Sequence, residues 1–109
     1  MWKCSVCGYV HDGSSAPDKC PKCGAAAEKF EKLDDSAVEL ITRSRYTNSL
    51  HTMLSSMASD IIDLAEEGIE DELDPGCVGV FNKAREFGMI LRGLVEAELA
   101  GHMKKGKWG

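Results

Sequence analysis

Apolar residues between positions 36 and 67 recur at the period of an α-helix. Leu50, Leu54, Met57, Ile61 and Leu64 follow one another at intervals of four and three residues. A stripe at this spacing runs along one side of a helix and is typical of coiled-coil packing. Val38, Ile41, Met53 and Ile62 widen the stripe. The pattern predicts a helix over about residues 36–67 that packs through Leu50–Leu64.

A second periodic segment covers about residues 75–104. Its apolar and small residues, at the same four-three spacing, are Cys77, Phe81, Ala84, Gly88, Leu91 and Val95. Val80, Phe87, Ile90 and Leu94 lie beside this row. Gly88 would let a neighbouring helix approach closely, since glycine has no side chain. We therefore predict a second helix, packed through Cys77–Val95.

Capping residues locate the ends of both helices. Ser36 with Glu39 fits a capping box, in which serine is the N-cap and glutamate reaches back from the third helical position. Gly68 is the expected stop of the first helix. Asp74 before Pro75 predicts the start of the second, because aspartate caps well and proline favours the first helical position.

Two helices of roughly 30 residues, each about 45 Å long, predict an antiparallel hairpin across the acidic loop that joins them. On both helices the apolar residues cover more of the surface than a single stripe, so a hairpin alone would leave apolar surface exposed. We expect a homodimer that forms a four-helix bundle. The alternatives are that residues 1–33 or a different protein cover the second stripe.

Residues 1–33 carry no helical period and contain two C-x-x-C pairs, Cys4/Cys7 and Cys20/Cys23, each followed by glycine. Two such turns can bring four thiolates to one tetrahedral metal ion. Disulfides or redox-active C-x-x-C motifs are the alternatives. No apolar leader precedes Cys4, and the segment is too short for a thioredoxin-like unit. A Cys₄ site suits zinc or iron, and it leaves no open position for a substrate.

Residues 1–33 resemble a rubredoxin-type module, in the shortened form found in rubrerythrins. The resemblance rests on Trp2, Cys4-x-x-Cys7-Gly8-Tyr9, Gly13, Ala16-Pro17, Cys20-Pro21-x-Cys23-Gly24 and Lys29–Leu33. It implies a small metal-bound β/knuckle fold with Tyr9, Phe30 and Trp2 in its core. It also implies one iron, held by the four cysteines, that cycles between ferric and ferrous states. The electron would come from an NAD(P)H-dependent reductase and pass to oxidative-stress or other redox proteins.

The resemblance does not extend to the di-iron domain of rubrerythrins, which needs Glu-x-x-His motifs on helices. The residues three positions before His51 and His102 are Asn48 and Leu99. Peroxidase activity is therefore not expected. His51 is interpreted as a polar or half-buried helix residue, with a second-metal or haem ligand in the dimer as the alternative. Cys77 is interpreted as a buried residue of the Cys77–Val95 row, with a thiol that ionises more readily near the helix start as the alternative.

The charge of −5 is unevenly distributed. Residues 1–33 hold five lysines and four acidic residues, whereas residues 34–109 hold eight basic and fourteen acidic ones. An acidic chain without a basic stripe is a poor ligand for nucleic acid. No apolar run approaches the roughly 20 residues that span a membrane. We expect a cytoplasmic chain with a metal module at 1–33 and a two-helix hairpin at 34–109.

The resemblance, together with the closed Cys₄ site, implies a non-catalytic electron carrier with a redox protein partner. The alternative is a zinc-stapled module for protein–protein interaction, in which the helices carry the function.

Overall fold

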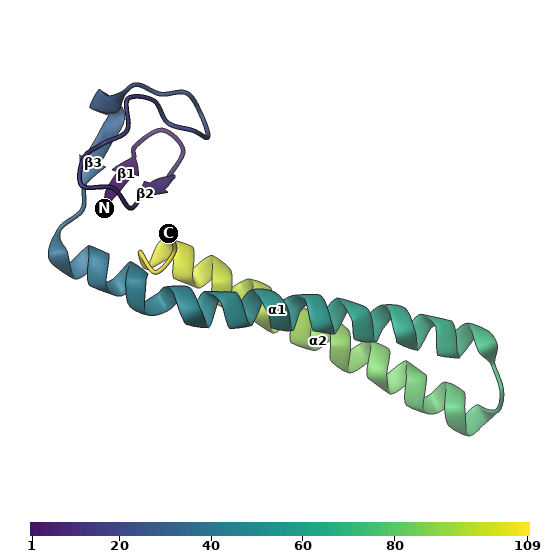
Figure 1. The fold of residues 1–109 in the computed structure, drawn as a ribbon. Coiled ribbons are helices and arrows are strands. Elements are labelled where there is room, and N and C mark those ends of the chain that lie inside the picture. The colour runs from purple at the N-terminus through teal and green to yellow at the C-terminus, as the bar shows by residue number, and fades with distance from the viewer. The chain divides into compact units, whose positions relative to one another are not determined.

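The computed structural model describes residues 1–109 and divides into two compact units. The first comprises Met1–Arg45 with Lys105–Gly109, and the second comprises Tyr46–Lys104. The first unit contains strands β1 (Trp2–Cys4), β2 (Val10–His11) and β3 (Phe30–Lys32), and the short 3₁₀ helix η1 (Ala27–Lys29). Two long helices follow, α1 (Asp35–Asp71) and α2 (Pro75–Lys104), as Figure 1 shows. Neither helix is long and apolar enough to cross a membrane.

The three strands form an antiparallel sheet in the order β2-β1-β3. Central strand β1 places Cys4 opposite Phe30 of β3 and Trp2 opposite His11 of β2. The buried cluster of this unit consists of Cys4, Cys20 and Phe30, with Trp2, Cys7, Tyr9, Ala16 and Ala25 packed against it. The aromatic core expected from the sequence is therefore present, and cysteines make up much of it.

Helix α1 is capped by Asp34. The Asp34 Oδ1 atom accepts hydrogen bonds from the backbone N–H of Ala37 at 2.8 Å and from the hydroxyl of Ser36 at 2.9 Å. The prediction that Ser36 is the N-cap was wrong, because an aspartate two residues earlier supplies the acceptor and Ser36 lies inside the first turn. Helix α2 begins as predicted, with the Cys77 N–H donating to Asp74 Oδ1 at 2.7 Å.

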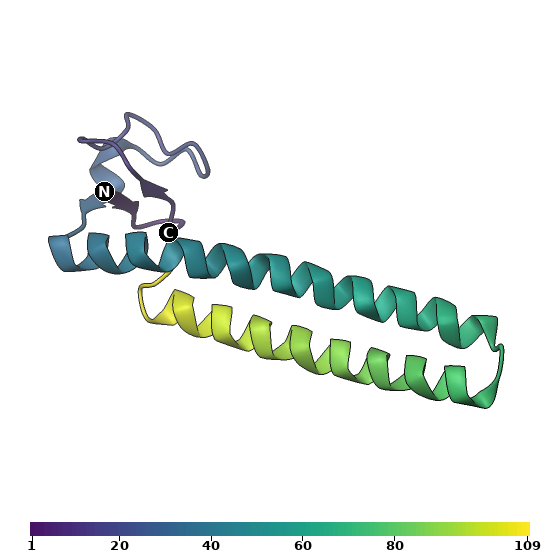
Figure 2. The same cartoon turned by 60° about the horizontal axis from the view of Figure 1, so that its bottom comes forward.

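The two helices run side by side in opposite directions, as the two views agree (Figures 1 and 2). Residues 72–74 make the turn, and Glu72 adopts a left-handed conformation with φ of 52°. The prediction that Gly68 ends the first helix was wrong, since α1 continues to Asp71. Gly68 instead lies against the ring of Phe81, where a β-carbon would overlap the ring. Its role is therefore close approach of the helices.

The contact between the helices, which we call the hairpin seam, agrees with the prediction for α2 and differs for α1. On α2 it follows the predicted row, with Gly88 and Val95 buried. On α1 it runs through His51, Ser55, Ala58, Ile62 and Ala65, each one residue after a member of the predicted stripe. One residue turns the stripe by about 100° round a helix. The predicted stripe Leu50, Leu54, Met57, Ile61 and Leu64 is exposed.

Candidate metal centre

The two C-x-x-C segments form the same local structure twice. In the first, Gly8 N–H donates to the Cys4 carbonyl at 2.9 Å, and Cys4 N–H donates to the Tyr9 carbonyl at 2.9 Å. In the second, Gly24 N–H donates to the Cys20 carbonyl at 2.9 Å, and Cys20 N–H to the Ala25 carbonyl at 2.8 Å. Gly8 and Gly24 have φ of +80° and +76°, which glycine adopts without steric cost. These turns orient both thiols of each pair to one side.

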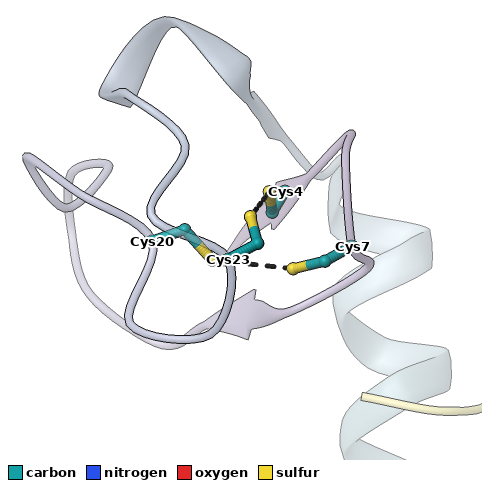
Figure 3. Close-up of side chains that lie close together, drawn as sticks. All are labelled: Cys4, Cys7, Cys20 and Cys23. Atoms are coloured by element: carbon teal, nitrogen blue, oxygen red, sulfur yellow. Dashed lines mark hydrogen bonds between the residues drawn. The ribbon is translucent and has the colours of Figure 1, made fainter.

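The four thiols converge on one point, as Figure 3 shows. The Sγ atoms of Cys4, Cys7, Cys20 and Cys23 all lie within 4.8 Å of one another. Cys4 Sγ is 3.7 Å from Cys23 Sγ, and Cys7 Sγ is 3.6 Å from Cys20 Sγ. Sulfurs placed tetrahedrally at about 2.3 Å from an ion are about 3.8 Å apart. The cluster thus has the dimensions of a tetrathiolate metal site.

All five cysteines are free thiols in the structure. The sulfur separations of 3.7 and 3.6 Å both link one turn to the other, and both are far longer than the roughly 2.05 Å of a disulfide bond. The fifth cysteine, Cys77, is half-buried in the first turn of α2 and belongs to the other unit. The arrangement therefore matches metal binding better than a disulfide framework.

The four thiols differ in their access to water. Cys4 and Cys20 are buried, Cys7 is half-buried and Cys23 is exposed. The first two belong to the buried cluster that also contains Phe30. An ion bound at the centre would be closest to solvent on the side of Cys23 and Cys7.

Backbone N–H groups tune the acidity of these thiols. Burial raises the pKa of the Cys20 thiol, but the N–H groups of Cys23 and Lys22, with the neighbouring thiols, lower it to about 6. Cys4 follows the same pattern: burial opposes ionisation, and the N–H groups of Cys7 and Val6 bring its pKa below the ordinary value.

Cys23 behaves in the opposite way. The Ala25 N–H lowers the pKa of its thiol, but desolvation and the three neighbouring thiols raise that pKa more, to about 12. Charge on the first thiolates opposes charge on the next. A bound cation would remove this conflict and hold all four groups as thiolates.

No second group of three or more Cys, His, Asp or Glu ligand atoms converges in this way anywhere in residues 1–109. His102 is buried, and its Nδ1 lies 2.5 Å from Asn48 Oδ1 while its Nε2 lies 3.2 Å from Glu98 Oε1. His51 was predicted beside the Leu50 stripe. It lies in the hairpin seam, with its ring edge-on to His102 at 5.9 Å. Asn48 was not identified from the sequence as a buried partner, because a single polar residue gives no sign of the row His51, Ser55 and Ala58 to which it belongs in the structure.

Comparisons with known proteins add the family of this module. Residues 2–31 match the family described as rubrerythrin, rubredoxin-like domain. Residues 2–31 thus form a rubredoxin-like module of the rubrerythrin type. Reverse rubrerythrin-1 of Clostridium acetobutylicum is 53% identical over 34 residues, which is 31% of this chain and 19% of that protein. Rubrerythrin of Nitratidesulfovibrio vulgaris is 50% identical over 32 residues, 29% of this chain and 17% of that protein.

The rubredoxin-like module is the whole extent of these similarities. A putative rubrerythrin of Methanocaldococcus jannaschii likewise matches over 30 residues at 47% identity, 28% of this chain and 15% of that protein. The matched segment thus spans less than a fifth of each of these relatives. No solved structure matches the chain. The remainder of the chain is a helical hairpin joined to a rubredoxin-like metal-binding module.

Proposed function

We propose that this protein is a one-electron carrier with a mononuclear iron centre bound by Cys4, Cys7, Cys20 and Cys23. The observation that carries the proposal is the convergence of four thiol sulfurs within 4.8 Å, inside a segment that matches a rubredoxin-like domain. Iron bound there would exchange one electron between its ferric and ferrous states. Four protein ligands leave no position for a substrate, so the centre itself is not a catalytic site.

The chain's own groups suit this role. The N–H groups of Val6 and Cys7 approach the Cys4 sulfur, and those of Lys22 and Cys23 approach the Cys20 sulfur. Donors of this kind stabilise thiolate charge in both oxidation states without moving. The half-buried Cys7 and exposed Cys23 form the edge through which an electron would enter and leave.

The carrier needs two redox partners, a reductase that donates the electron and a protein that accepts it. The five lysines of residues 1–33 are all exposed, and they suit a weak, charge-guided encounter with an acidic surface. The hairpin would hold the module in an assembly in the cytoplasm, either as a homodimer or on a partner protein.

Metal analysis with a visible spectrum tests the proposal, on full-length protein purified from iron-replete anaerobic cells. We expect one iron per chain and a red colour that dithionite bleaches and air restores. Because recombinant cells can load zinc into an iron site, a colourless zinc protein would be unfolded, stripped and reconstituted with ferrous iron. Failure to take up iron, or an iron centre that does not change colour with dithionite, would contradict the electron-transfer role.

A zinc-stapled interaction module is the second candidate. It is favoured by the long apolar stripe that the hairpin leaves exposed on α1, since such surfaces mark contacts with proteins. In that case the metal would stabilise residues 1–33, and the helices would carry the function. One zinc per chain that iron cannot replace would support this candidate.

A further inference from the structure

The hairpin exposes two apolar stripes, one on each helix. On α1 the stripe is Leu50, Leu54, Met57, Ile61 and Leu64, and on α2 it is Val80, Phe87, Ile90 and Leu94. Every member immediately precedes a residue of the hairpin seam, as Leu64 precedes Ala65 and Phe87 precedes Gly88. Each stripe therefore lies about 100° round its helix from the seam, on the same rotational side of it.

An ion pair shows that both stripes belong to one face of the hairpin. Glu66 and Arg85 each follow a seam residue by one position, and their side chains meet at 3.1 Å across the hairpin. Residues that follow the seam thus lie together on one flank of this antiparallel pair. Residues that precede the seam on the two helices must then lie together on the other flank. We call this flank the apolar face.

The apolar face is large enough for a stable interface. Its nine side chains keep between 36% and 67% of their residue surface exposed. Together they offer on the order of 900 Å², and each partner in a standard protein–protein interface buries about 800 Å². A patch of this size exceeds what monomeric proteins usually expose.

We propose that a second copy of this chain covers the apolar face. The two hairpins pack head to tail, by which we mean that their turns lie at opposite ends of an antiparallel four-helix bundle. The face is made of two parallel rows of Leu, Ile, Met, Phe and Val, so it can pack against an identical face across a two-fold axis. The interface involves the hairpin alone, so it forms whichever metal the cysteines bind.

Charge favours the head-to-tail arrangement. The half of the hairpin nearest the turn, residues 60–86, carries nine acidic and two basic side chains. The other half, residues 46–59 and 87–104, carries two of each. Two hairpins with their turns together would bring both acidic halves into contact. Head-to-tail packing instead places each acidic half beside a neutral half, which lowers the repulsion.

Sedimentation equilibrium with matched variants tests the interface. We expect the full-length protein to be a dimer at micromolar concentration. Ile90→Glu places a charge at the centre of the apolar face and should weaken dimerisation at least tenfold. Met89→Glu is the control, because Met89 is the adjacent residue, is similarly exposed and lies on the opposite flank. Circular dichroism should show native helicity in both variants.

Several results would overturn the proposed interface. A wild-type chain that stays monomeric at 100 µM would show that a second copy does not cover the apolar face and would indicate another protein as its partner. A dimer that survives Ile90→Glu, or that Met89→Glu dissociates equally, would place the interface elsewhere.

Zero-length carbodiimide cross-linking of a mixture of ¹⁴N- and ¹⁵N-labelled protein tests the direction. Lys104 and Asp74 lie at opposite ends of α2, about 45 Å apart within one chain. Head-to-tail packing predicts mixed-isotope cross-links between Lys104 of one copy and Glu72 or Asp74 of the other. Mixed cross-links that join Lys83 to these same carboxylates would instead place the turns together and overturn the arrangement.

Discussion

Residues 1–33 and the hairpin differ in what their interiors contain. In the first, two of the three buried residues are the cysteines Cys4 and Cys20, and Phe30 is the third. In the second, the buried residues of the seam are mostly small or polar, including Ala58, Ala65, Gly88 and the Asn48–His102 pair. The first interior holds groups that repel one another when ionised, and the second holds groups that let two backbones approach. A bound cation is therefore needed in one region and close fit in the other.

Cys20→Ser should have the largest effect and should separate the two regions. Below about 40 residues a domain usually needs a metal or another cross-link to fold, so loss of one ligand should abolish stoichiometric metal binding and unfold residues 1–33. The helical signal at 222 nm should remain, because the hairpin does not contain the site. Metal analysis and circular dichroism on the same sample measure the metal stoichiometry and the helix content.

Cys77→Ser is the matched control for this change. Cys77 is a free thiol in the other unit, so its loss should leave metal stoichiometry unchanged. If Cys20→Ser retained one metal per chain, the assignment of the four ligands would be wrong.

Gly88→Leu should have an intermediate effect with the reverse pattern. A β-carbon on Gly88 would already lie 3.0 Å from Ile62 Cγ1 and 3.2 Å from the Ala58 carbonyl oxygen. Overpacking of this kind costs about 1–3 kcal/mol of stability. The midpoint of urea unfolding, followed by the helical circular dichroism signal, should therefore shift to a lower urea concentration. Metal stoichiometry should not change.

Gly93→Leu provides the comparison on the same helix. A β-carbon on Gly93 meets nothing within 4 Å, and replacing a helical glycine by leucine gains roughly 0.5–1 kcal/mol of helix propensity. Both variants must be measured at one protein concentration, since dimerisation would add to stability. Equal stability of the two variants would show that the helices do not meet at Gly88.

Asp74→Asn should have the smallest effect, and only at some pH values. The Cys77 N–H lowers the pKa of the Asp74 carboxyl below its ordinary value of 3.8. The charged cap therefore stabilises the hairpin above that ordinary value, and the stabilisation is lost as pH falls through the lowered pKa. The thermal unfolding midpoint of wild type should be higher than that of Asp74→Asn near neutral pH. The difference should shrink as the pH falls below 3.8 and through the lowered pKa.

Asp60→Asn is the control for pH dependence, because Asp60 lies in the middle of α1 and caps no helix. A constant gap between wild type and Asp74→Asn from pH 7 to pH 2.5 would mean that the carboxylate charge contributes nothing to the cap.

The sequence predicted the two regions unequally, for a physical reason. Each cysteine turn depends on contacts within six residues, and the repetition of the same C-x-x-C-G motif was enough to predict convergence of the four sulfurs. The start of α2 is local in the same way. The seam of α1 is not determined locally. Periodicity identifies the most apolar stripe of a helix, but it does not identify the surface that this stripe meets. Leu50–Leu64 was assigned to the hairpin, and the neighbouring row through Ala58 and Ala65 makes that contact instead.

The buried pair Asn48 and His102 could not be predicted for a related reason. Each residue alone is polar and would be placed on the surface, since burial of either is favourable only with a hydrogen-bond partner. Their partnership joins residues 54 positions apart. The cap at Asp34 shows a smaller limit: several neighbouring Asp and Ser residues fit the same motif, and only the backbone geometry selects one.

The left-handed conformation of Glu72 bears on the order in which the hairpin folds. A residue other than glycine in this conformation costs roughly 1–2 kcal/mol, and the turn has only three residues between the two helices. The unfolded chain thus has little tendency to bend at this point in advance. We expect the helices to meet first through side chains of the seam, with the turn closing late. Changes at Glu72 should then alter the unfolding rate more than the folding rate.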